Sequence, residues 1–272
     1  MNQNQLARQN FYQEINQADE NINLAKAALY IAQEEYPQLN IDEYINALDT
    51  MANEVKERLP DQRYPLRIIN TINQYIYQDL GFQGNTKDYY SPQNSFLNDV
   101  IDQRAGIPIT LSLIYLEIAQ RLDFPMVGIG MPGHFLIRPN FDDVGIFVNA
   151  FNNGETLFEQ DCEELLTQIY QQPVKMQAQF LEKVSNRHFL ARMLTNLKHI
   201  YLQQRQLTKA LTTVERILLL FPSSAIQMRD QGLIKLELKQ WEQACQDLEF
   251  YLAMVPNAED APIIRQLLDK IR

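Results

Sequence analysis

Residues 104–112 read RAGIPITLS, and the central helix of the first domain is predicted from them. Two shorter stretches flank this one, NSFLN at residues 94–98 and PGHFLI at residues 132–137. Pro108 suits the first turn of a helix, because the N–H that proline lacks would be unpaired there in any case. The sequence therefore predicts a helix that begins at Pro108 and runs to about Leu122.

On both sides of this helix the sequence predicts short, well-separated elements. Helices precede it, each ending close to a proline or a glycine, over residues 22–35, 42–59 and 66–80. β-rich runs follow it, separated by proline and glycine turns, at residues 126–129, 135–137 and 145–151. Helices followed by short strands predict an α+β core for this part of the chain.

The C-terminal third contains an internal repeat of 34 residues. Ala210 and Ala244 are 34 residues apart, and so are Pro222 and Pro256. This is the period of tetratricopeptide repeats, in which a small residue lets two helices approach closely and a proline ends the second helix. The pattern predicts helices at about 187–204, 207–221, 225–239 and 241–254, with an amphipathic cap over 261–272. We therefore expect an α+β domain over residues 1–181 and an all-α repeat region over residues 182–272.

The three stretches around Pro108 closely resemble the SirB family of transglutaminase-like proteins that carry tetratricopeptide repeats. The resemblance extends from about residue 20 to the end of the chain, because helices precede and repeats follow the motif in that family too. It implies a papain/transglutaminase-like core, in which active relatives have a cysteine at a helix N-terminus, a histidine on the next strand and an aspartate on the strand after it. A thiolate nucleophile, an imidazole that lowers its pKa and a carboxylate that orients the imidazole explain that order.

Matched residue by residue, this pattern is incomplete in the chain. The nucleophile position falls on Pro108, whose side chain has no nucleophilic group. His134 matches the histidine, and Asn149 takes the third position, where the family usually has aspartate. Asparagine can still orient an imidazole, as it does in papain-like enzymes. The resemblance therefore implies a degenerate cleft around Arg104, Pro108, His134 and Asn149 that lacks its nucleophile.

Three other residues are candidates for the nucleophile. Thr110 and Ser112 lie one turn into the central helix, but a hydroxyl needs a strongly placed base and an oxyanion hole that the sequence does not indicate. Cys162 follows Asp161, a possible helix N-cap, so its thiol is a candidate for a lowered pKa. Its place after the histidine fails the family order, and a small buried apolar residue is the alternative role. Cys245 lies inside a repeat helix and suits packing.

Composition and motifs argue against several other classes of function. The three histidines, His134, His188 and His199, are too few and too far apart for a metal site, and the chain has no glycine-rich nucleotide-binding motif, so we expect no metal and no cofactor. A net charge of −10 argues against nucleic-acid binding. Apolar runs end well before the roughly 20 residues that a membrane helix needs, and residues 1–14 do not resemble an export signal. Because the chain has only two cysteines, it suits a reducing compartment, and we expect a cytoplasmic protein.

Two segments allow more than one interpretation. Between Glu182 and Arg216 there are seven basic residues and two acidic ones, a local charge of +5. They dock on the acidic N-terminal domain, lie solvated, or form a surface for an acidic partner. Tyr89 and Tyr90, in the stretch DYYSP at residues 88–92, either line a ligand groove or belong to an ordered loop packed on the core.

The missing nucleophile and the repeats together favour a pseudoenzyme that binds rather than catalyses. Helical repeats usually present an extended face to a partner. We therefore expect a protein or peptide partner at the degenerate cleft or on the repeats. The alternative is a hydrolase or acyl transferase, peptidase or transglutaminase-like, that uses Cys162 or a hydroxyl as its nucleophile.

Overall fold

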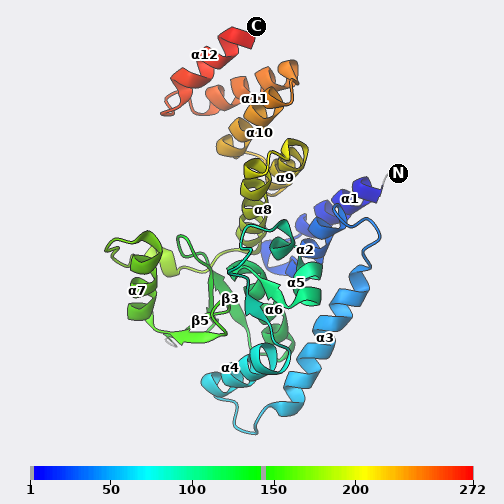
Figure 1. The fold of residues 1–272 in the computed structure, drawn as a ribbon, viewed down its shortest axis with the longest axis vertical. Coiled ribbons are helices and arrows are strands. Elements are labelled where there is room, and N and C mark those ends of the chain that lie inside the picture. Colours follow the sequence, from blue (N-terminus) through cyan, green and yellow to red (C-terminus); the bar gives the residue numbers. More distant parts are fainter. Residues whose placement is uncertain (1–2, 142–144, 272) are drawn as a thin grey trace. The chain divides into compact units, whose positions relative to one another are not determined.

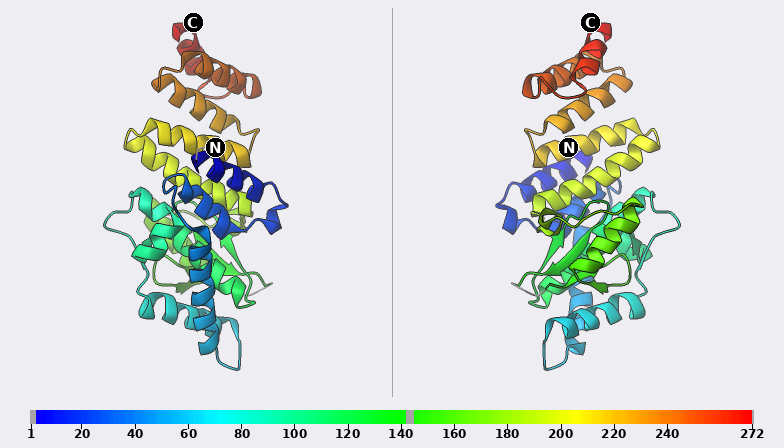
Figure 2. Two further views of the ribbon diagram at one scale, coloured as in Figure 1. Left: turned by 90° about the vertical axis from the view of Figure 1, so that its right-hand side faces the viewer. Right: turned by 90° about the vertical axis from the view of Figure 1, so that its left-hand side faces the viewer.

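The computed structural model describes residues 3–141 and 145–271, and the chain divides into two compact units (Figure 1 and Figure 2). The first unit ends at Leu190 and the second begins at Ala191, so the boundary falls inside one helix, α8 (Asn186–Gln203). The division expected between residues 181 and 182 concerns folding domains and stays a prediction. Among the described residues, no helix combines the length and the apolar character that a membrane span requires.

The N-terminal part of the first unit is helical. Its elements are α1 (Gln3–Ile15), η1 (Asp19–Asn21), α2 (Leu24–Gln33), α3 (Ile41–Arg58), α4 (Pro65–Asn73) and the π-helical segment η2 (Gln74–Asp79). The predicted helices correspond to α2, to α3 and to α4 with η2, and Gly81 follows the last of them at φ +75°. α1 was not among the predicted helices, because the buried side chains among residues 5–15 are Ala7, Phe11 and Ile15, spaced four residues apart.

The helix α6 (Pro108–Arg121) is the centre of the first unit, since every residue from Pro108 to Ala119 is buried. Pro108 is its first residue, which confirms the predicted start. The elements before it are η3 (Pro92–Ser95), α5 (Leu97–Gln103) and a parallel pair of two-residue strands, β1 (Gln83–Gly84) and β2 (Ala105–Gly106). This strand pair was not predicted, because two residues are too few for an alternating pattern.

An antiparallel sheet follows α6, with the strand order β3-β4-β5-β6. Its strands are β3 (Met126–Ile129), β4 (Leu136–Pro139), β5 (Phe147–Asn149) and β6 (Glu155–Leu157). β3 and β4 confirm the predicted runs, and β5 is shorter than the predicted 145–151. β6 was missed because its three residues, of which Leu157 is buried, show no clear alternation.

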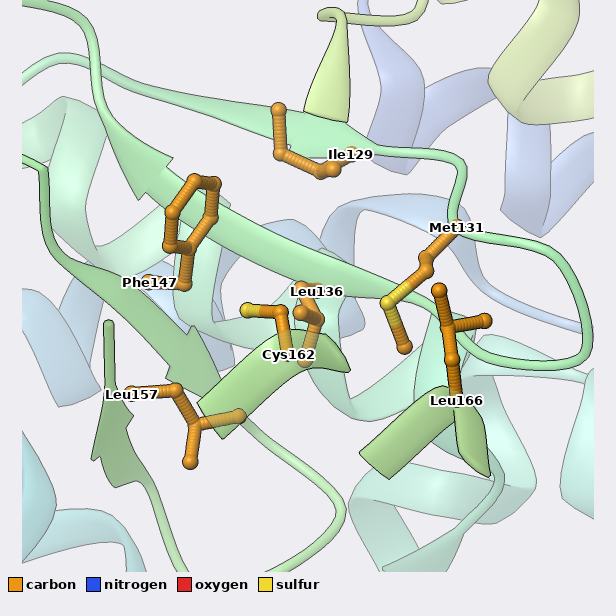
Figure 3. Packing of buried hydrophobic residues seen from close by; sticks show 7 residues of the cluster. All are labelled: Ile129, Met131, Leu136, Phe147, Leu157, Cys162 and Leu166. Carbon is orange, nitrogen blue, oxygen red and sulfur yellow. The ribbon is translucent and has the colours of Figure 1, made fainter. Parts of the chain in front are cut away.

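The sheet lies between α6 on one side and α7 (Glu159–Tyr170) on the other (Figure 1). The helix α7 packs on the sheet through a cluster of buried side chains: Ile129, Met131, Leu136, Phe147, Leu157, Cys162 and Leu166 (Figure 3). A short helical turn, η4 (Ala178–Leu181), then leads toward α8.

The second unit consists of helices, and their bounds agree with the predicted repeats. After α8 they are α9 (Leu207–Leu220), α10 (Ala225–Glu237), α11 (Trp241–Met254) and α12 (Ala261–Ile271). Ala210 and Ala244 are fully buried, as close helix contacts require. The period also appears in the backbone, because Arg205 and Lys239, which are 239 − 205 = 34 residues apart, turn between helices with φ of 58° and 61°.

The two repeats differ at one matching position. In the second repeat Gly232 makes the close helix contact, since a Cβ on it would lie 2.7 Å from Leu248 Cγ. In the first repeat this position is Lys198, whose buried Nζ lies 2.7 Å from Asp230 Oδ2. Arg216 is buried as well. Lys198 and Arg216 therefore do not belong to a basic surface, which corrects the reading of the +5 segment as entirely solvent-facing or partner-facing.

Candidate functional site

The structure brings together two of the residues assigned to the cleft, His134 and Asn149. His134 lies just before β4, and Asn149 is the last residue of the neighbouring strand β5. The distance from His134 Nε2 to Asn149 Oδ1 is 2.9 Å, which is a hydrogen bond. Because an amide oxygen only accepts, Nε2 carries the proton and Nδ1 is the basic nitrogen of the neutral ring.

Backbone contacts hold both members of this pair. The His134 N–H donates to the Met131 carbonyl oxygen at 3.1 Å, in a turn that contains Gly133 at φ +74°. The Asn149 carbonyl oxygen accepts the N–H groups of Asn152 and Gly154 at 3.1 and 3.0 Å. The asparagine is buried and the histidine is partly exposed. The imidazole is therefore oriented as it would be in a papain-like site.

An aromatic side chain links this pair to the start of α6. The ring centroids of His134 and Phe151 are 6.2 Å apart, and those of Phe151 and Tyr89 are 6.0 Å apart, both with edge-to-face geometry. A Cβ on Gly84 would lie 2.6 Å from the Phe151 carbonyl oxygen, so the two backbones touch there. Gly84 belongs to β1, which pairs with β2, and β2 ends two residues before Pro108.

The tyrosine stretch at residues 88–92 belongs to an ordered loop. The Asn94 side-chain amide donates to the carbonyl oxygens of Asp88 and Tyr89 at 2.6 and 3.1 Å. Tyr89 packs in the aromatic contact described above, whereas Tyr90 is 62% exposed. The ordered-loop interpretation is confirmed for Tyr89, and Tyr90 is an exposed aromatic residue whose ring contacts Tyr89.

Two residues that organise the site, Asn94 and Phe151, were missed in the sequence. Asn94 lies within NSFLN, one of the stretches that carry the family resemblance, and Phe151 lies close to the third position of the family pattern, Asn149. The signal was an asparagine among apolar residues and an aromatic residue two positions after Asn149. Neither signal indicates which loop or ring the side chain will contact.

A buried proline and a capping threonine occupy the first turn of α6. Pro108 is buried as the first helical residue, and Ile107 is the N-cap. The Ile107 N–H donates to Thr110 Oγ1 at 3.1 Å, and the Thr110 hydroxyl donates to the Asn94 carbonyl oxygen at 2.7 Å. Thr110 and Ser112 are both fully buried. Thr110 therefore caps the helix, and neither hydroxyl is open to a substrate.

Arg104 makes its described contacts away from the histidine pair. It ends α5 in the left-handed conformation, at φ 54°. Its Nη1 donates to the Leu80 carbonyl oxygen at 2.6 Å, and the residue is exposed. Of the four residues assigned to the cleft, His134 and Asn149 are in direct contact. Pro108 is linked to this pair indirectly, through the β1–β2 strands and Phe151. Arg104 makes its described side-chain contact elsewhere, at the end of η2.

Cys162 is the fourth residue of α7, and its thiol is buried in the core. α7 begins at Glu159, so Asp161 is its third residue and not the N-cap that the sequence indicated; its carboxylate accepts the Phe158 N–H at 2.7 Å. Cys162 is fully buried in the cluster of Figure 3. Burial, and then the charges of Asp161 and Glu159, raise the pKa of its thiol to about 12. The thiol is therefore protonated at neutral pH, which supports the packing role and argues against the nucleophile.

The described residues support neither a metal site nor a catalytic role for Cys245. Within residues 3–141 and 145–271, no group of three histidine, cysteine or acidic side chains is placed to hold a metal ion. Cys245 is partly buried and packs against the core of α11 and α12.

A proline-started central helix, a histidine just before a neighbouring strand and an asparagine on the next strand agree with a papain/transglutaminase-like fold, here followed by helical repeats. Comparison with known proteins agrees. Residues 42–195 match the transglutaminase-like superfamily, and residues 197–269 match the tetratricopeptide repeat. The chain belongs to the transglutaminase-like superfamily and has the SirB-like architecture that the resemblance implied.

Its relatives include bacterial proteins with the same extent. The UPF0162 protein of Xylella fastidiosa (strain 9a5c) is 34% identical over 254 residues, which cover 91% of this chain and 89% of that protein. UPF0162 protein YchA of Escherichia coli (strain K12) is 26% identical over 239 residues, 87% of each chain. A shorter match, 36% identical over 110 residues, covers 38% of this chain and 18% of F-box only protein 21 of Homo sapiens.

Proposed function

We propose that this protein is a non-catalytic protein-binding or regulatory protein, which uses the degenerate cleft and the helical repeats as binding surfaces. The observation that carries the proposal is the start of α6, where Pro108 is the buried first residue. The family resemblance assigns the catalytic cysteine to this position. The hydrogen-bonded pair of His134 and Asn149 is linked to this helix start through Phe151 and the β1–β2 strand pair. The cleft therefore retains polar groups for a ligand but has no thiol at the position that chemistry requires.

The repeats support a binding role because they leave two hollows, one with a mixed apolar and charged lining and one with a mainly apolar lining. One cavity of about 210 Å³ lies between α8, α9 and α10 and is lined by Leu202, Leu207 and Leu233 together with charged residues such as Glu237. A second, of about 400 Å³, lies between α10 and the end of α11, and its lining includes Ile226, which is 59% exposed. Such surfaces suit a peptide with both apolar and charged side chains.

Ile226 and Ile263 provide a matched test of the repeat surface. Their exposures are similar, 59% and 61%, but of the two it is Ile226 that lines the larger hollow. Partners captured from cell extract by the wild-type protein, and quantified by mass spectrometry, should be lost with Ile226→Glu and retained with Ile263→Glu. Equal recovery with both variants would contradict this surface.

The non-catalytic part of the proposal has its own test. The wild-type protein should show no transglutaminase, deamidase or peptidase turnover. Turnover that is abolished by His134→Ala would contradict the proposal, and loss of that turnover with Cys162→Ala would assign the reaction to the buried thiol.

A further inference from the structure

β3 is an edge strand of the antiparallel sheet, because the strand order places it at one end. Part of its outer side is covered by the chain itself. Lys183 pairs antiparallel with Ile129, and the Val184 N–H donates to the Gly128 carbonyl oxygen at 2.9 Å. The chain then enters α8 at Asn186 and no longer follows the strand. The edge is therefore covered at its end and open at its beginning.

The open part of the edge presents the backbone of Met126. The Pro125 carbonyl oxygen accepts the Asn140 N–H at 2.8 Å, so it points toward β4. Backbone groups alternate in direction along a strand, so those of Met126 and Gly128 point to the outer side, in agreement with the bond from Val184. The hydrogen bonds described for residues 3–141 and 145–271 include none to the outward N–H or C=O of Met126.

A cavity of about 450 Å³ lies along this open edge. Residues 126–128 of β3 line it, together with the start of α2, the later turns of α6 and the first residues of α8 up to Phe189. Its volume falls within the roughly 300–1,000 Å³ typical of ligand sites. Since a strand rises only about 3.3 Å per residue, the space suits a short extended segment and not a folded domain.

The charged side chains that line this cavity are both carboxylates, Glu20 and Glu117. Glu117 is already used, because its carboxylate binds Arg121 Nη1 at 2.5 Å and the Ala25 N–H at 3.3 Å. Glu20 is exposed at the cavity and is available to a ligand. Residues 1–181 carry 11 basic and 24 acidic residues, and this net negative charge also favours a basic ligand.

We propose that β3 is a docking edge for an extended, basic peptide segment of a partner protein. The segment adds a strand beside Met126, where it exchanges backbone hydrogen bonds, and it places a lysine or arginine side chain near Glu20. Strand addition of this kind takes its affinity from main-chain hydrogen bonds and its specificity from side-chain pockets. This site shares no lining residue with the His134 pair or with the hollows of the repeats, so it is a further binding surface.

Two synthetic probes test the docking edge on the full-length protein. They are the labelled, end-blocked peptides Lys-Val-Lys-Val-Lys and Glu-Val-Glu-Val-Glu, compared by fluorescence anisotropy at low salt. The basic peptide should bind at least about tenfold more tightly than the acidic one, because opposite charges attract and like charges repel at such an edge. Hydrogen exchange of the Met126 N–H should slow when the basic peptide is bound.

Three variants locate the binding. Glu20→Lys should weaken the basic peptide about tenfold, whereas Glu57→Lys, the same charge change at an exposed position of α3, should leave it unchanged. Met126→Pro removes the outward N–H at the first residue of a strand, where proline is tolerated, and should also weaken binding.

Three results would overturn the proposal. The first is equal affinity for both peptides or affinity for neither. The second is binding of the basic peptide that neither Glu20→Lys nor Met126→Pro alters. The third is a doubled mass in light scattering that Met126→Pro reverses, because the edge would then pair with a second copy of this chain.

Discussion

Replacing Pro108 by cysteine tests whether the start of α6 and the histidine pair still form a catalytic geometry. The variant places a thiol at the first residue of a 14-residue helix, where the helix dipole favours the thiolate. His134 Nδ1 is the nitrogen able to accept the thiol proton, because Nε2 is bound to Asn149. Both effects should lower the pKa of the new thiol below the ordinary value of about 8.5.

Cys162 provides the internal reference for the size of this effect. Its pKa of about 12 leaves about one thiol in 100,000 ionised at pH 7. A pKa of about 7 for the new thiol, within the range of cysteines at helix N-termini, leaves about half of it ionised. The ionised fractions of the two thiols then differ by about 50,000-fold. The more acidic thiolate is intrinsically less nucleophilic, and this divides the advantage by about 300. We expect the new thiol to alkylate more than about 100-fold faster than Cys162, and the burial of Cys162 widens the gap.

The assay is iodoacetamide labelling as a function of pH, resolved by site with mass spectrometry. Pro108→Ser controls for the loss of the proline, and unfolding the protein in denaturant should bring both thiols to similar rates. Adding His134→Ala should move the midpoint of the Pro108→Cys profile upward, because the imidazolium that stabilises the thiolate is lost. A midpoint at or above about 8.5, unchanged by His134→Ala, would refute the alignment of Pro108 with the pair.

Three further predictions concern the repeat unit. Gly232→Ala should lower the free energy of unfolding by about 1–2 kcal/mol despite better helix propensity, because a Cβ there lies 2.7 Å from Leu248 Cγ; unchanged stability in chemical denaturation contradicts this. The hydrogen bond from Tyr251, and then the contact with Arg229, lower the pKa of Asp260. This carboxylate therefore contributes stability at higher pH, and the contribution should be lost as the pH falls below about 3.9 toward the lowered pKa. Asp260→Asn should remove this dependence from the pH profile of thermal unfolding, and a profile identical to that of the wild type would contradict the prediction. A fragment of residues 186–272 should melt weakly or without cooperativity, because two repeats bury little apolar surface, and a sharp high-temperature transition would show the opposite.

The elements that the sequence predicted well are those whose physical cause is local. Proline fixes its own φ and lacks an N–H, so Pro108 has one favourable place in a helix, and the helix begins there. The repeat helices were predictable because the same small residues and prolines recur after 34 residues. Short strands such as β1, β2 and β6 have no such local cause, since their pairing depends on partners distant in the sequence.

The site errors have the same origin. A carboxylate near the start of a helix can be the N-cap or the third helical residue, because both positions meet unpaired N–H groups, and Asp161 takes the second role. Cys162 then moves one turn inward and faces the core. A count of charges cannot show that Lys198 is neutralised by Asp230 on another helix, since that contact spans 32 residues.

The persistence of the His134 and Asn149 pair does not by itself indicate catalysis, because the fold has its own use for both residues. The Asn149 carbonyl oxygen closes the turn before β6, and its side chain holds an imidazole that packs on Phe151. Phe151 in turn packs on Tyr89 and on the backbone of β1. Asn149→Ala would remove the acceptor of the His134 Nε2–H at a cost of about 1–3 kcal/mol, whether or not the cleft binds a ligand. A change at the pair therefore alters stability as well as function, whereas Pro108→Cys adds a thiol and leaves the contacts of His134, Asn149 and Phe151 in place.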